Sequence, residues 1–319
     1  MLILITDQNF GDDARVERDL IAGTEHELVV ATCSDEDDVV AAIEAHSPDV
    51  IVVQFAPIGA RAIARATALR GVVRYGIGVD NIDLAAAAER GVKVARVADY
   101  CVDEVADHTL ALVLALERHV VELATATAAG AWSFRAGGPI RRLRGLTFGL
   151  LGFGQIGRAV AERAHGFGFR LIAHDPGLGD DEIRAHRVEP VDFDTLTAQA
   201  DILSLHVPLS PATRGIVGRD ALRRLKRNAV VVNTARGGLV DEAAVADALV
   251  ARTVGAVALD VFEQEPPDPA APLSSAPHLL VTPHAAWYSE TAIVELREKA
   301  VDAALMLLRG ETPAGLVTA

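Results

Sequence analysis

The chain has 319 residues, half of them apolar, and a formal net charge of −14 at pH 7. This length is sufficient for two domains that each bury a hydrophobic core. The acidic balance excludes a general affinity for nucleic acid or for an anionic membrane, because phosphate binding needs clustered Lys and Arg. We therefore expect a small-molecule partner, with no nucleic acid and no membrane.

The cysteines and the N-terminus predict a cytoplasmic protein. Cys33 and Cys101 lie far apart and form no metal-binding or redox spacing, so we expect two reduced, buried thiols and no metal site. Residues 1–6 are apolar but follow no basic segment, which is typical of a first strand and not of a signal peptide. Apolar stretches also stay shorter than a membrane span requires.

Short apolar runs alternate with helical patterns through the first part of the chain. Such alternation predicts βαβ units and a parallel sheet. We predict strands at residues 2–6, 27–32, 50–53 and 72–75, and helices at residues 15–22, 36–45 and 60–68.

A long helical pattern covers residues 102–129, with Asp103 as a candidate N-cap and Gly130 as its stop. The next residues, 132–144, break the pattern and form a connecting loop. Three arginines end this loop, and they either form a solvated or subunit-contacting surface or bind a ligand: Arg141, Arg142 and Arg144.

A second alternating series follows and ends in a long final helix at residues 289–309. Its predicted strands cover residues 147–151, 170–174, 202–206, 229–233, 255–259 and 279–282.

A glycine-rich loop directly follows the strand predicted at residues 147–151 and opens a helix. The first glycine permits a tight turn, the second lets the backbone approach a pyrophosphate, and the third allows close packing of helix and strand. The helix N-terminus then offers free N–H groups to phosphates. The loop reads Gly152-Phe153-Gly154-Gln155-Ile156-Gly157.

Asp175 ends the next strand, eighteen residues after Gly157. A carboxylate at this position accepts hydrogen bonds from the ribose hydroxyls of adenosine and repels a 2′-phosphate. The loop and this carboxylate together predict a dinucleotide site that prefers NAD to NADP.

The alternation and the glycine loop predict an α/β fold with two doubly wound parallel-sheet domains. A Rossmann NAD-binding domain of residues 99–287 is inserted into a smaller, flavodoxin-like domain formed by residues 1–98 and 288–319. The final helix thus returns the chain to the smaller domain.

Three side chains of complementary chemistry follow apolar strands of the second series. Arg236 supplies a cation, Glu265 a carboxylate and His284 a group that titrates near neutrality. An arginine, a carboxylate and a histidine at strand ends indicate an anion-binding site with an acid/base.

The chain resembles the D-isomer-specific 2-hydroxyacid dehydrogenases, which include 3-phosphoglycerate dehydrogenases and glyoxylate reductases. Within that family it is most similar to the branch of the C-terminal-binding-protein corepressors. Residues 1–70 match only in pattern. The resemblance rests on the glycine loop and on residues 72–83, 233–241, 260–266 and 284–290.

The resemblance implies a catalytic trio. Arg236 would grip the carboxylate and carbonyl of a 2-ketoacid, for which a planar guanidinium is suited. His284 would give a proton to the carbonyl oxygen or remove it in the reverse direction, and Glu265 would orient the imidazole. The hydride itself would be carried by NAD(H).

The resemblance also implies the lining of the cofactor and the substrate. Asp260 looks like the residue that meets the nicotinamide carboxamide, and Trp287 is either a wall of the substrate pocket or a core aromatic. The other cofactor residues would be His206, Val207, Pro208, Thr234, Ala235, Arg236 and His284. The substrate loop would be Arg74-Tyr75-Gly76-Ile77-Gly78, or else an ordinary turn after a strand, with Asp80, Asn81 and Asp83 as turn and helix-cap residues.

Two cations depart from the family pattern. Arg96 and Ala98 stand where many relatives carry Asn and Pro, and Arg74 adds a charge beside the glycines. Arg74, with or without Arg96, either accommodates a second anionic group on the substrate, such as a phosphonate, phosphate or carboxylate, or pairs with local carboxylates.

Two other functions are compatible with parts of the sequence. An NADH-sensing corepressor would keep the fold, but the complete trio and the lack of long disordered tails favour an enzyme, although corepressors also keep the trio. A formate or phosphite dehydrogenase is disfavoured, because the formate enzymes carry glutamine where this chain has Glu265. The resemblance further implies a homodimer.

Overall fold

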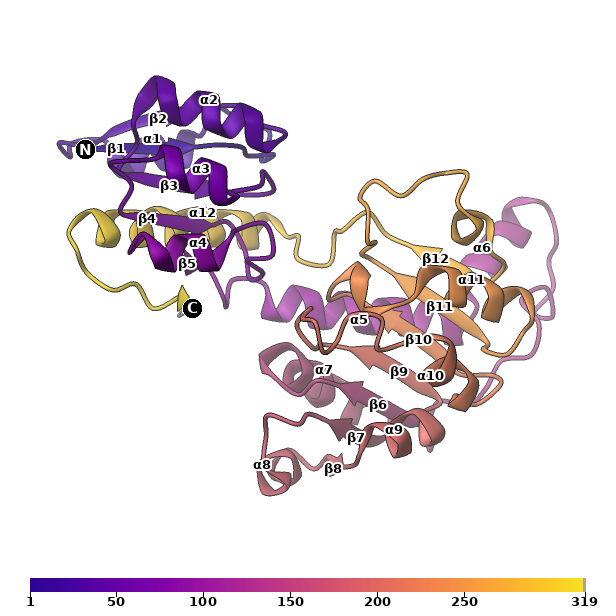
Figure 1. Cartoon of the computed structure of the whole chain (residues 1–319). Coiled ribbons are helices and arrows are strands. Elements are labelled where there is room, and N and C mark those ends of the chain that lie inside the picture. The colour runs from indigo at the N-terminus through magenta and orange to yellow at the C-terminus, as the bar shows by residue number, and fades with distance from the viewer. Residues whose placement is uncertain (318–319) are drawn as a thin grey trace. The chain divides into compact units, whose positions relative to one another are not determined.

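The computed structural model describes residues 1–317, and within them the chain forms two compact α/β units (Figure 1). Met1–Tyr100 and the segment that begins at Ser289 form the smaller unit, and Cys101–Tyr288 form the larger one. The prediction of two doubly wound domains, one inserted into the other, is confirmed in its fold class. The functions that the sequence assigns to the two parts stay predictions.

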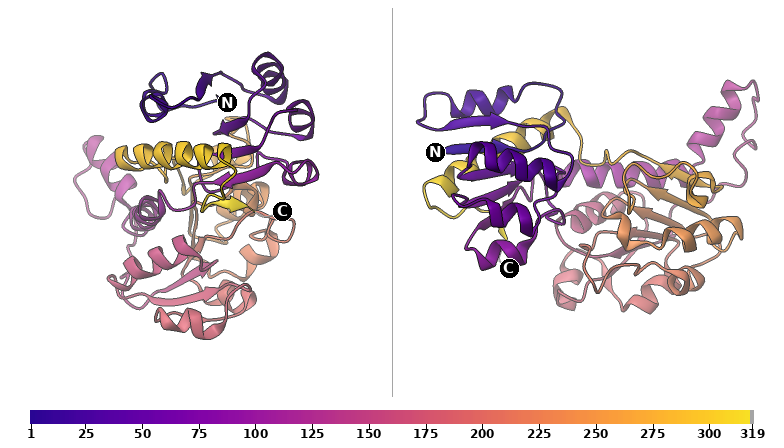
Figure 2. Two further views of the ribbon diagram at one scale, coloured as in Figure 1. Left: turned by 90° about the vertical axis from the view of Figure 1, so that its left-hand side faces the viewer. Right: turned by 45° about the horizontal axis from the view of Figure 1, so that its top comes forward.

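The smaller unit is built on a sheet with the strand order β13-β5-β4-β3-β1-β2, in which β13 is antiparallel to β5 and the other neighbours are parallel. Figure 2 shows α12 on one face of this sheet, where it packs beside α1, and α2, α3 and α4 on the other face. The strands are β1 (Leu2–Ile5), β2 (Glu27–Val30), β3 (Val50–Val53), β4 (Gly71–Arg74), β5 (Lys93–Arg96) and β13 (Leu316–Val317), and the helices are α1 (Arg15–Ile21), α2 (Glu36–His46), α3 (Ala60–Arg65), α4 (Leu84–Glu89) and α12 (Glu290–Leu308).

Sequence chemistry explains these elements directly. All four residues of β3 are buried because helices cover both faces of the sheet, so its sequence is a continuous apolar run. Asp35, Asp83 and Ser289 each accept a hydrogen bond from a backbone N–H in the first turn of the following helix. The prediction that Asp83 is a helix cap is therefore confirmed.

A buried ionic network joins three parts of the smaller unit. Arg297 of α12 donates to Glu17 of α1 and to Asp12, at distances of 2.6 to 2.9 Å. Tyr75, directly after β4, donates its hydroxyl proton to Glu17 at 2.8 Å. Because Glu17 and Arg297 are almost fully buried, neither charge tolerates the loss of its partner.

The larger unit has a parallel sheet with the order β12-β11-β10-β9-β6-β7-β8. The chain reverses its winding direction between β6 and β9, which is where doubly wound sheets bind ligands. The strands are β6 (Thr147–Leu151), β7 (Arg170–His174), β8 (Glu189–Pro190), β9 (Ile202–Leu205), β10 (Val230–Asn233), β11 (Ala256–Leu259) and β12 (Leu279–Val281), and the helices are α5 (Val102–Glu117), α6 (Val120–Ala128), α7 (Gln155–His165), α8 (Asp180–Ala185), α9 (Phe193–Gln199), α10 (Arg219–Arg224) and α11 (Glu242–Val250).

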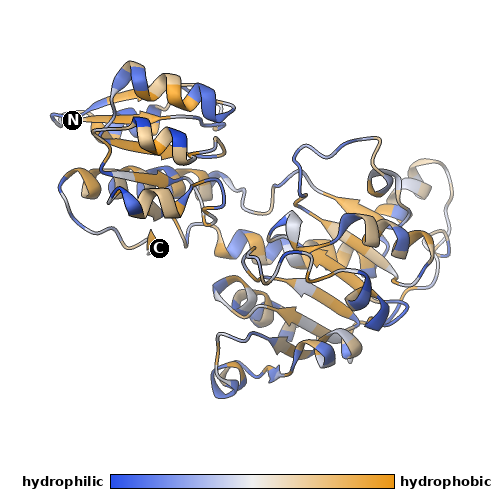
Figure 3. Ribbon diagram, in the orientation of Figure 1, coloured by the Kyte–Doolittle hydropathy of each residue, from blue (hydrophilic) through white to orange (hydrophobic). Residues whose placement is uncertain are grey.

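Apolar cores lie on both faces of this sheet. Helices α5 and α7 cover one face around Phe148 and Leu150, and α9, α10 and α11 cover the other around Leu203 and Leu205. Figure 3 shows the corresponding pattern, with hydrophobic strands inside and hydrophilic residues on the outer sides of the helices. Among residues 1–317, no helix is apolar over a length that would cross a membrane.

The predicted strands and most of the helices are confirmed to within one to three residues, but the single helix predicted at residues 102–129 is wrong. The structure has α5 and α6 instead, because His119 takes a left-handed conformation with φ of 51° between them. The apolar pattern continues across this break, so it gave no signal there. Gly130 does end α6, with φ of 89°.

The structure also decides the role of one predicted helix cap and of one loop arginine near α5. Asp103 is not the N-cap, because α5 begins one residue earlier, after Cys101, and the Asp103 carboxylate pairs with Arg163 at 2.6 Å. Arg141 pairs with the buried carboxylate of Glu117, which accounts for this arginine without a ligand.

Candidate active site

The carboxyl edge of the larger sheet carries all the catalytic residues that the sequence predicts. Arg236 lies three residues beyond β10, Glu265 lies in the loop after β11, and His284 follows β12. These strands are parallel neighbours in the order β10-β11-β12, so their carboxyl ends lie at one edge. The structure thus brings together three side chains of which the first and the last, Arg236 and His284, lie 48 positions apart in the sequence.

Backbone hydrogen bonds hold the His284 turn in an uncommon conformation. His284 has φ of 52°, which side chains other than glycine rarely adopt and which is found at functional sites. Its N–H donates to the carbonyl of Asp260 at 2.8 Å. The Asp260 carboxylate, only 1% exposed, accepts from the N–H groups of Ala285 and Ala286, both at 2.9 Å. The turn is therefore fixed to the end of β11.

Glu265 bridges the loop after β11 and the imidazole of His284. One carboxylate oxygen accepts from the N–H of Phe262 at 3.0 Å, and the other lies 2.7 Å from His284 Nδ1. Burial opposes ionisation of Glu265, but these two hydrogen bonds and the charges of His284 and Arg236 outweigh it and lower its pKa. The ionised carboxylate can only accept, so His284 Nδ1 carries the proton of this hydrogen bond.

Arg236 is positioned by the tight turn that follows β10. The buried side chain of Asn233 donates to the Arg236 carbonyl at 2.8 Å and accepts from the N–H of Ala235 at 3.0 Å. A side chain at Gly237 would overlap the backbone of Phe262, so only glycine lets this turn approach the Glu265 loop. The guanidinium thus lies near enough to Glu265 to lower its pKa.

The three glycines of the loop after β6 differ in their surroundings. A Cβ at Gly152, where φ is 94°, would lie 2.7 Å from the backbone of His206 and Val207. A Cβ at Gly157 would lie 2.5 Å from the Gly152 carbonyl oxygen. At Gly154, by contrast, a Cβ would meet nothing within 4 Å. Gly152 and Gly157 therefore serve packing. Gly154 faces open space at the start of α7, where Gln155 and Ile156 follow. A pyrophosphate bound there, as the sequence predicts, would account for glycine at that position.

Asp175 directly follows β7 and is joined to the glycine loop. Its carboxylate accepts from the N–H of Phe153 at 2.8 Å and from the N–H of Gly177 at 2.9 Å. Each carboxylate oxygen keeps capacity for a further donor. The carboxylate is thus held beside the loop, as the predicted contact with ribose hydroxyls requires.

The remaining predicted cofactor residues follow β9 and β10, the two strands on one side of the point where the winding direction reverses. His206, Val207 and Pro208 follow β9, and Thr234 and Ala235 follow β10. His206 Nε2 lies 2.8 Å from the hydroxyl of Ser204, and burial lowers the pKa of His206 to about 3. The ring is therefore neutral at physiological pH and adds no charge to this edge.

Trp287 is partly buried at the end of the His284 turn. Its ring meets that of Tyr288 edge to face, with centroids 6.0 Å apart. Both interpretations of Trp287, as a wall of the substrate pocket or as a core aromatic, therefore stay predictions.

The predicted substrate loop belongs to the smaller unit. Gly76 has φ of 135°, and the Arg74 guanidinium occupies the space that a side chain at Gly76 would need. Arg74 and Arg96 are register partners at the carboxyl ends of β4 and β5, and Arg96 donates to the Ile77 carbonyl at 3.1 Å. The Tyr75 side chain, 1% exposed, lies in the core, so only its backbone is left for the predicted role beside Gly78.

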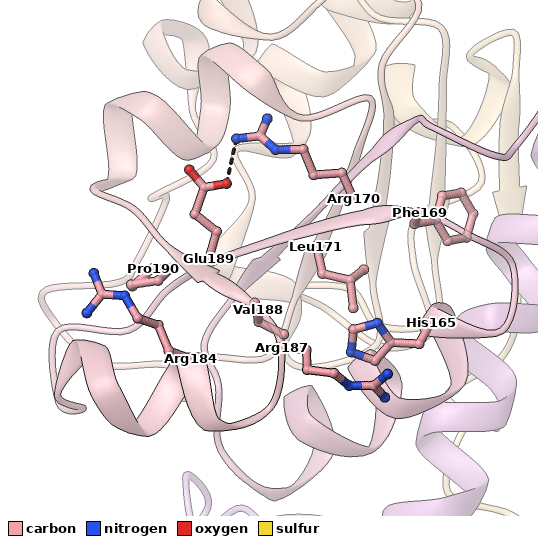
Figure 4. Close-up of a pocket in the computed structure, with 9 residues that line it drawn as sticks. All are labelled: His165, Phe169, Arg170, Leu171, Arg184, Arg187, Val188, Glu189 and Pro190. Carbon is pink, nitrogen blue, oxygen red and sulfur yellow. Dashed lines mark hydrogen bonds and ion pairs between the residues drawn. The ribbon is translucent and has the colours of Figure 1, made fainter.

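Arg184 and Arg187 line a cavity of about 450 Å³ near the start of β7 (Figure 4). Arg170, also in its lining, pairs with Glu189 at 2.7 Å. Asp175 lies at the opposite end of β7, so this cavity is separate from the glycine loop.

Sequence reasoning assigned no role to Asn233, whose side chain holds the Arg236 turn. Asn233 ends an apolar strand and could have been identified there, because a buried amide at a strand end has to satisfy backbone groups. In the part of the chain that the structure describes, no group of three or more His, Cys, Asp or Glu side chains is placed to hold a metal ion.

Comparisons with known proteins identify the same part of the chain. Residues 110–286 match the family model of the D-isomer specific 2-hydroxyacid dehydrogenase, NAD binding domain. The chain is 36% identical over 317 residues to a D-3-phosphoglycerate dehydrogenase of Methanocaldococcus jannaschii, with 99% of this chain but only 59% of that relative covered. It is 35% identical over 261 residues to a glycerate dehydrogenase of Methylorubrum extorquens, covering 80% of this chain and 81% of the relative.

A solved structure of similar fold is that of a glyoxylate reductase from Paecilomyes thermophila. It superposes with a TM-score of 0.87 at 28% identity, covering 99% of this chain and 97% of the other. The larger unit is therefore a nicotinamide-dinucleotide-binding domain.

The different surroundings of Gly154 and Gly157 predict different effects of alanine. Gly154→Ala should change the free energy of unfolding by less than about 1 kcal/mol, yet weaken NADH binding about tenfold or more, because its methyl group occupies the pyrophosphate space. Gly157→Ala should lower stability by about 1–3 kcal/mol as well, because its methyl group displaces the Gly152 carbonyl. Urea unfolding and NADH fluorescence titration measure the two effects. Equal NADH affinity in Gly154→Ala and wild type would contradict the assignment.

Proposed function

Because the chain belongs to the family of D-isomer-specific 2-hydroxyacid dehydrogenases, we propose that it interconverts a small 2-ketoacid and its D-2-hydroxyacid with NAD(H). The observation that carries this proposal is the 2.7 Å hydrogen bond between His284 Nδ1 and Glu265, in a turn beside Arg236. An acid/base with an oriented ring, next to a cation that suits a carboxylate, is what ketoacid reduction needs.

The proposed roles follow from the atoms of the trio. Glu265 accepts from Nδ1, so Nε2 is the nitrogen that delivers a proton to the substrate carbonyl oxygen when the imidazole is charged. Arg236 binds the substrate carboxylate and stabilises the negative charge that develops on the carbonyl oxygen. NADH, when bound, supplies the hydride to the carbonyl carbon. The oxidation direction uses neutral His284 as the base.

Asp175 supports a preference for NAD over NADP. Its carboxylate is fixed beside the glycine loop by the N–H groups of Phe153 and Gly177. In this position it would accept from two ribose hydroxyls and repel a 2′-phosphate.

The substrate that we propose carries a second anionic group. Arg74 and Arg96 bring two positive charges to the carboxyl ends of neighbouring strands, beside the predicted substrate loop, and Arg96 donates to the Ile77 carbonyl of that loop at 3.1 Å. The name of the D-3-phosphoglycerate dehydrogenase relative agrees with this class, since phosphoglycerate carries a phosphate besides its carboxylate, whereas the glycerate named for the other relative carries a single carboxylate. A phosphate, phosphonate or distal carboxylate would fill the role.

The two alternative functions that the sequence raised, a corepressor and a formate dehydrogenase, have less support. Similarity to the corepressor branch rests on the residues around Trp287, and the relatives named above are dehydrogenases and reductases, so they give no support to the NADH-sensing alternative. The formate dehydrogenase function is disfavoured as well, because this chain has Glu265 where the formate enzymes carry glutamine.

We also propose a cytoplasmic homodimer. Every residue of α6 is partly or fully exposed, and the loop after it presents Trp132 and Phe134 with exposed fractions of 92% and 79%. Large apolar side chains exposed this far are typical of interaction surfaces. A second copy of the chain is the partner that the family resemblance implies.

A panel of 2-ketoacids tests the proposed function. NADH oxidation should be fastest with members that carry a second anionic group, and Arg74→Met should lower kcat/KM for these about tenfold or more while it affects mono-anionic members less, because a lost charge-assisted contact is worth about 1.5–3 kcal/mol. Equal kcat/KM for mono-anionic and di-anionic ketoacids in the wild type would remove the second-anion proposal. Inactivity on every member would contradict the dehydrogenase.

Removal of the Asp175 carboxylate tests the coenzyme preference. Asp175→Ala should lower the ratio of kcat/KM for NADH to that for NADPH about tenfold or more, because two hydrogen bonds and a charge repulsion are lost. Asp181→Ala, an exposed carboxylate on α8, serves as the control. An unchanged ratio in Asp175→Ala would remove this residue from the ribose site.

A further inference from the structure

A second histidine lies behind the His284 turn. His108, on α5, has its Nε2 at 3.0 Å from the Thr282 hydroxyl and at 3.6 Å from a carboxylate oxygen of Asp260. The His108 side chain is about a quarter exposed, whereas Asp260 is buried. This histidine is outside the trio and was not assigned a role by the sequence.

The direction of these hydrogen bonds follows from counting protons. The Thr282 hydroxyl has a single proton, which it donates to the Asp260 carboxylate at 2.6 Å. It can therefore only accept from His108, so His108 Nε2 carries a proton. The result is a chain of donors from His108 through Thr282 to Asp260.

This chain ends on the groups that fix the catalytic turn. The oxygen of Asp260 that accepts from Thr282 also accepts from the N–H of Ala285, and the other oxygen accepts from Ala286. The Asp260 carbonyl accepts from the N–H of His284 itself. A residue held at φ of 52° needs such support, because its backbone conformation is unfavourable on its own.

The next residue of α5 reaches the other catalytic loop. Thr109 donates its hydroxyl proton to the Val105 carbonyl at 2.7 Å, so at 2.9 Å it accepts from the hydroxyl of Thr234, two residues before Arg236. Consecutive residues of one helix thus hold the loop that carries His284 and the loop that carries Arg236.

We propose that His108 is a positioning residue for the reaction, which acts through Thr282 and Asp260 to hold His284 where Nδ1 meets Glu265. This proposal rests on the proposed dehydrogenase function. The physical reason for a large effect is that a misplacement of a catalytic group by about 1 Å can cost about a hundredfold in rate.

Paired variants separate positioning from general stability. His108→Leu removes the donor and should lower kcat about 10- to 100-fold, with KM for the ketoacid changed by less than about threefold. His108→Gln keeps an N–H donor and should recover most of kcat. His119→Leu, at the junction of α5 and α6, is the matched control and should leave kcat unchanged. Wild-type kcat in His108→Leu, or equal losses in the Leu and Gln variants, would overturn the proposal.

A double variant tests whether the chain acts as one unit. Thr282→Val should lower kcat to a similar extent as His108→Leu, and the double variant should be no slower than the slower single variant, because both break the same chain. If the loss of kcat in the double variant equals the product of the two single losses, the two residues act independently and the proposed chain is contradicted.

A spectroscopic measurement tests the chain without turnover. NMR spectra of protein labelled with ¹⁵N-histidine report which ring nitrogen carries a proton. The signals of the His108 ring are those that disappear in His108→Gln, and they should show the proton on Nε2. A proton on Nδ1 alone would refute the donor chain even in a fully active enzyme. Wild-type inactivity on the whole ketoacid panel, with Nε2 protonated, would instead refute the dehydrogenase function and reduce His108 to a structural residue.

Discussion

The buried residue Asp260 is the one on which the candidate site depends, because it binds the turn that carries His284 to the end of β11. Its oxygens accept from Thr282, Ala285 and Ala286, and its carbonyl accepts from His284. A carboxylate this deeply buried is tolerated only when such donors satisfy it. The same bonds hold the turn in which His284 has a left-handed backbone conformation and its ring meets Glu265.

Parallel strands make this convergence possible. Residues far apart in the sequence follow β6, β7, β9, β10, β11 and β12, and every one of these strands ends at the same edge of the sheet. Glycine then decides how closely the loops approach. Gly152 and Gly157 allow the cofactor loop to pack on the end of β9, and Gly237 allows the Arg236 turn to pack on the Glu265 loop. Backbone contacts thereby place the glycine loop, Arg236 and His284 at one edge of the sheet.

Sequence reasoning could identify the fold and the trio because both depend on local signals. Apolar runs locate β6 and β7, and Gly152–Gly157, Asp175 and His284 stand at fixed places relative to such runs. Contacts between residues distant in the sequence produce no local sequence pattern of this kind. The break at His119 interrupts no apolar pattern, Tyr75 is in the core because Glu17 satisfies its hydroxyl, and His108 meets Thr282 only after α5 packs against β11. These features depend on side chains from elements distant in sequence.

The measurement that tests the central claim most directly is a double-variant cycle on Glu265 and His284, with kcat for 2-ketoacid reduction at pH 7 as the readout. His284→Ala should lose about 10²- to 10⁴-fold, the usual contribution of a positioned acid/base. If Glu265 acts by orienting His284, then Glu265→Ala combined with His284→Ala should be no slower than His284→Ala alone. A combined loss equal to the product of the two single losses, or full activity in His284→Ala, would contradict the claim.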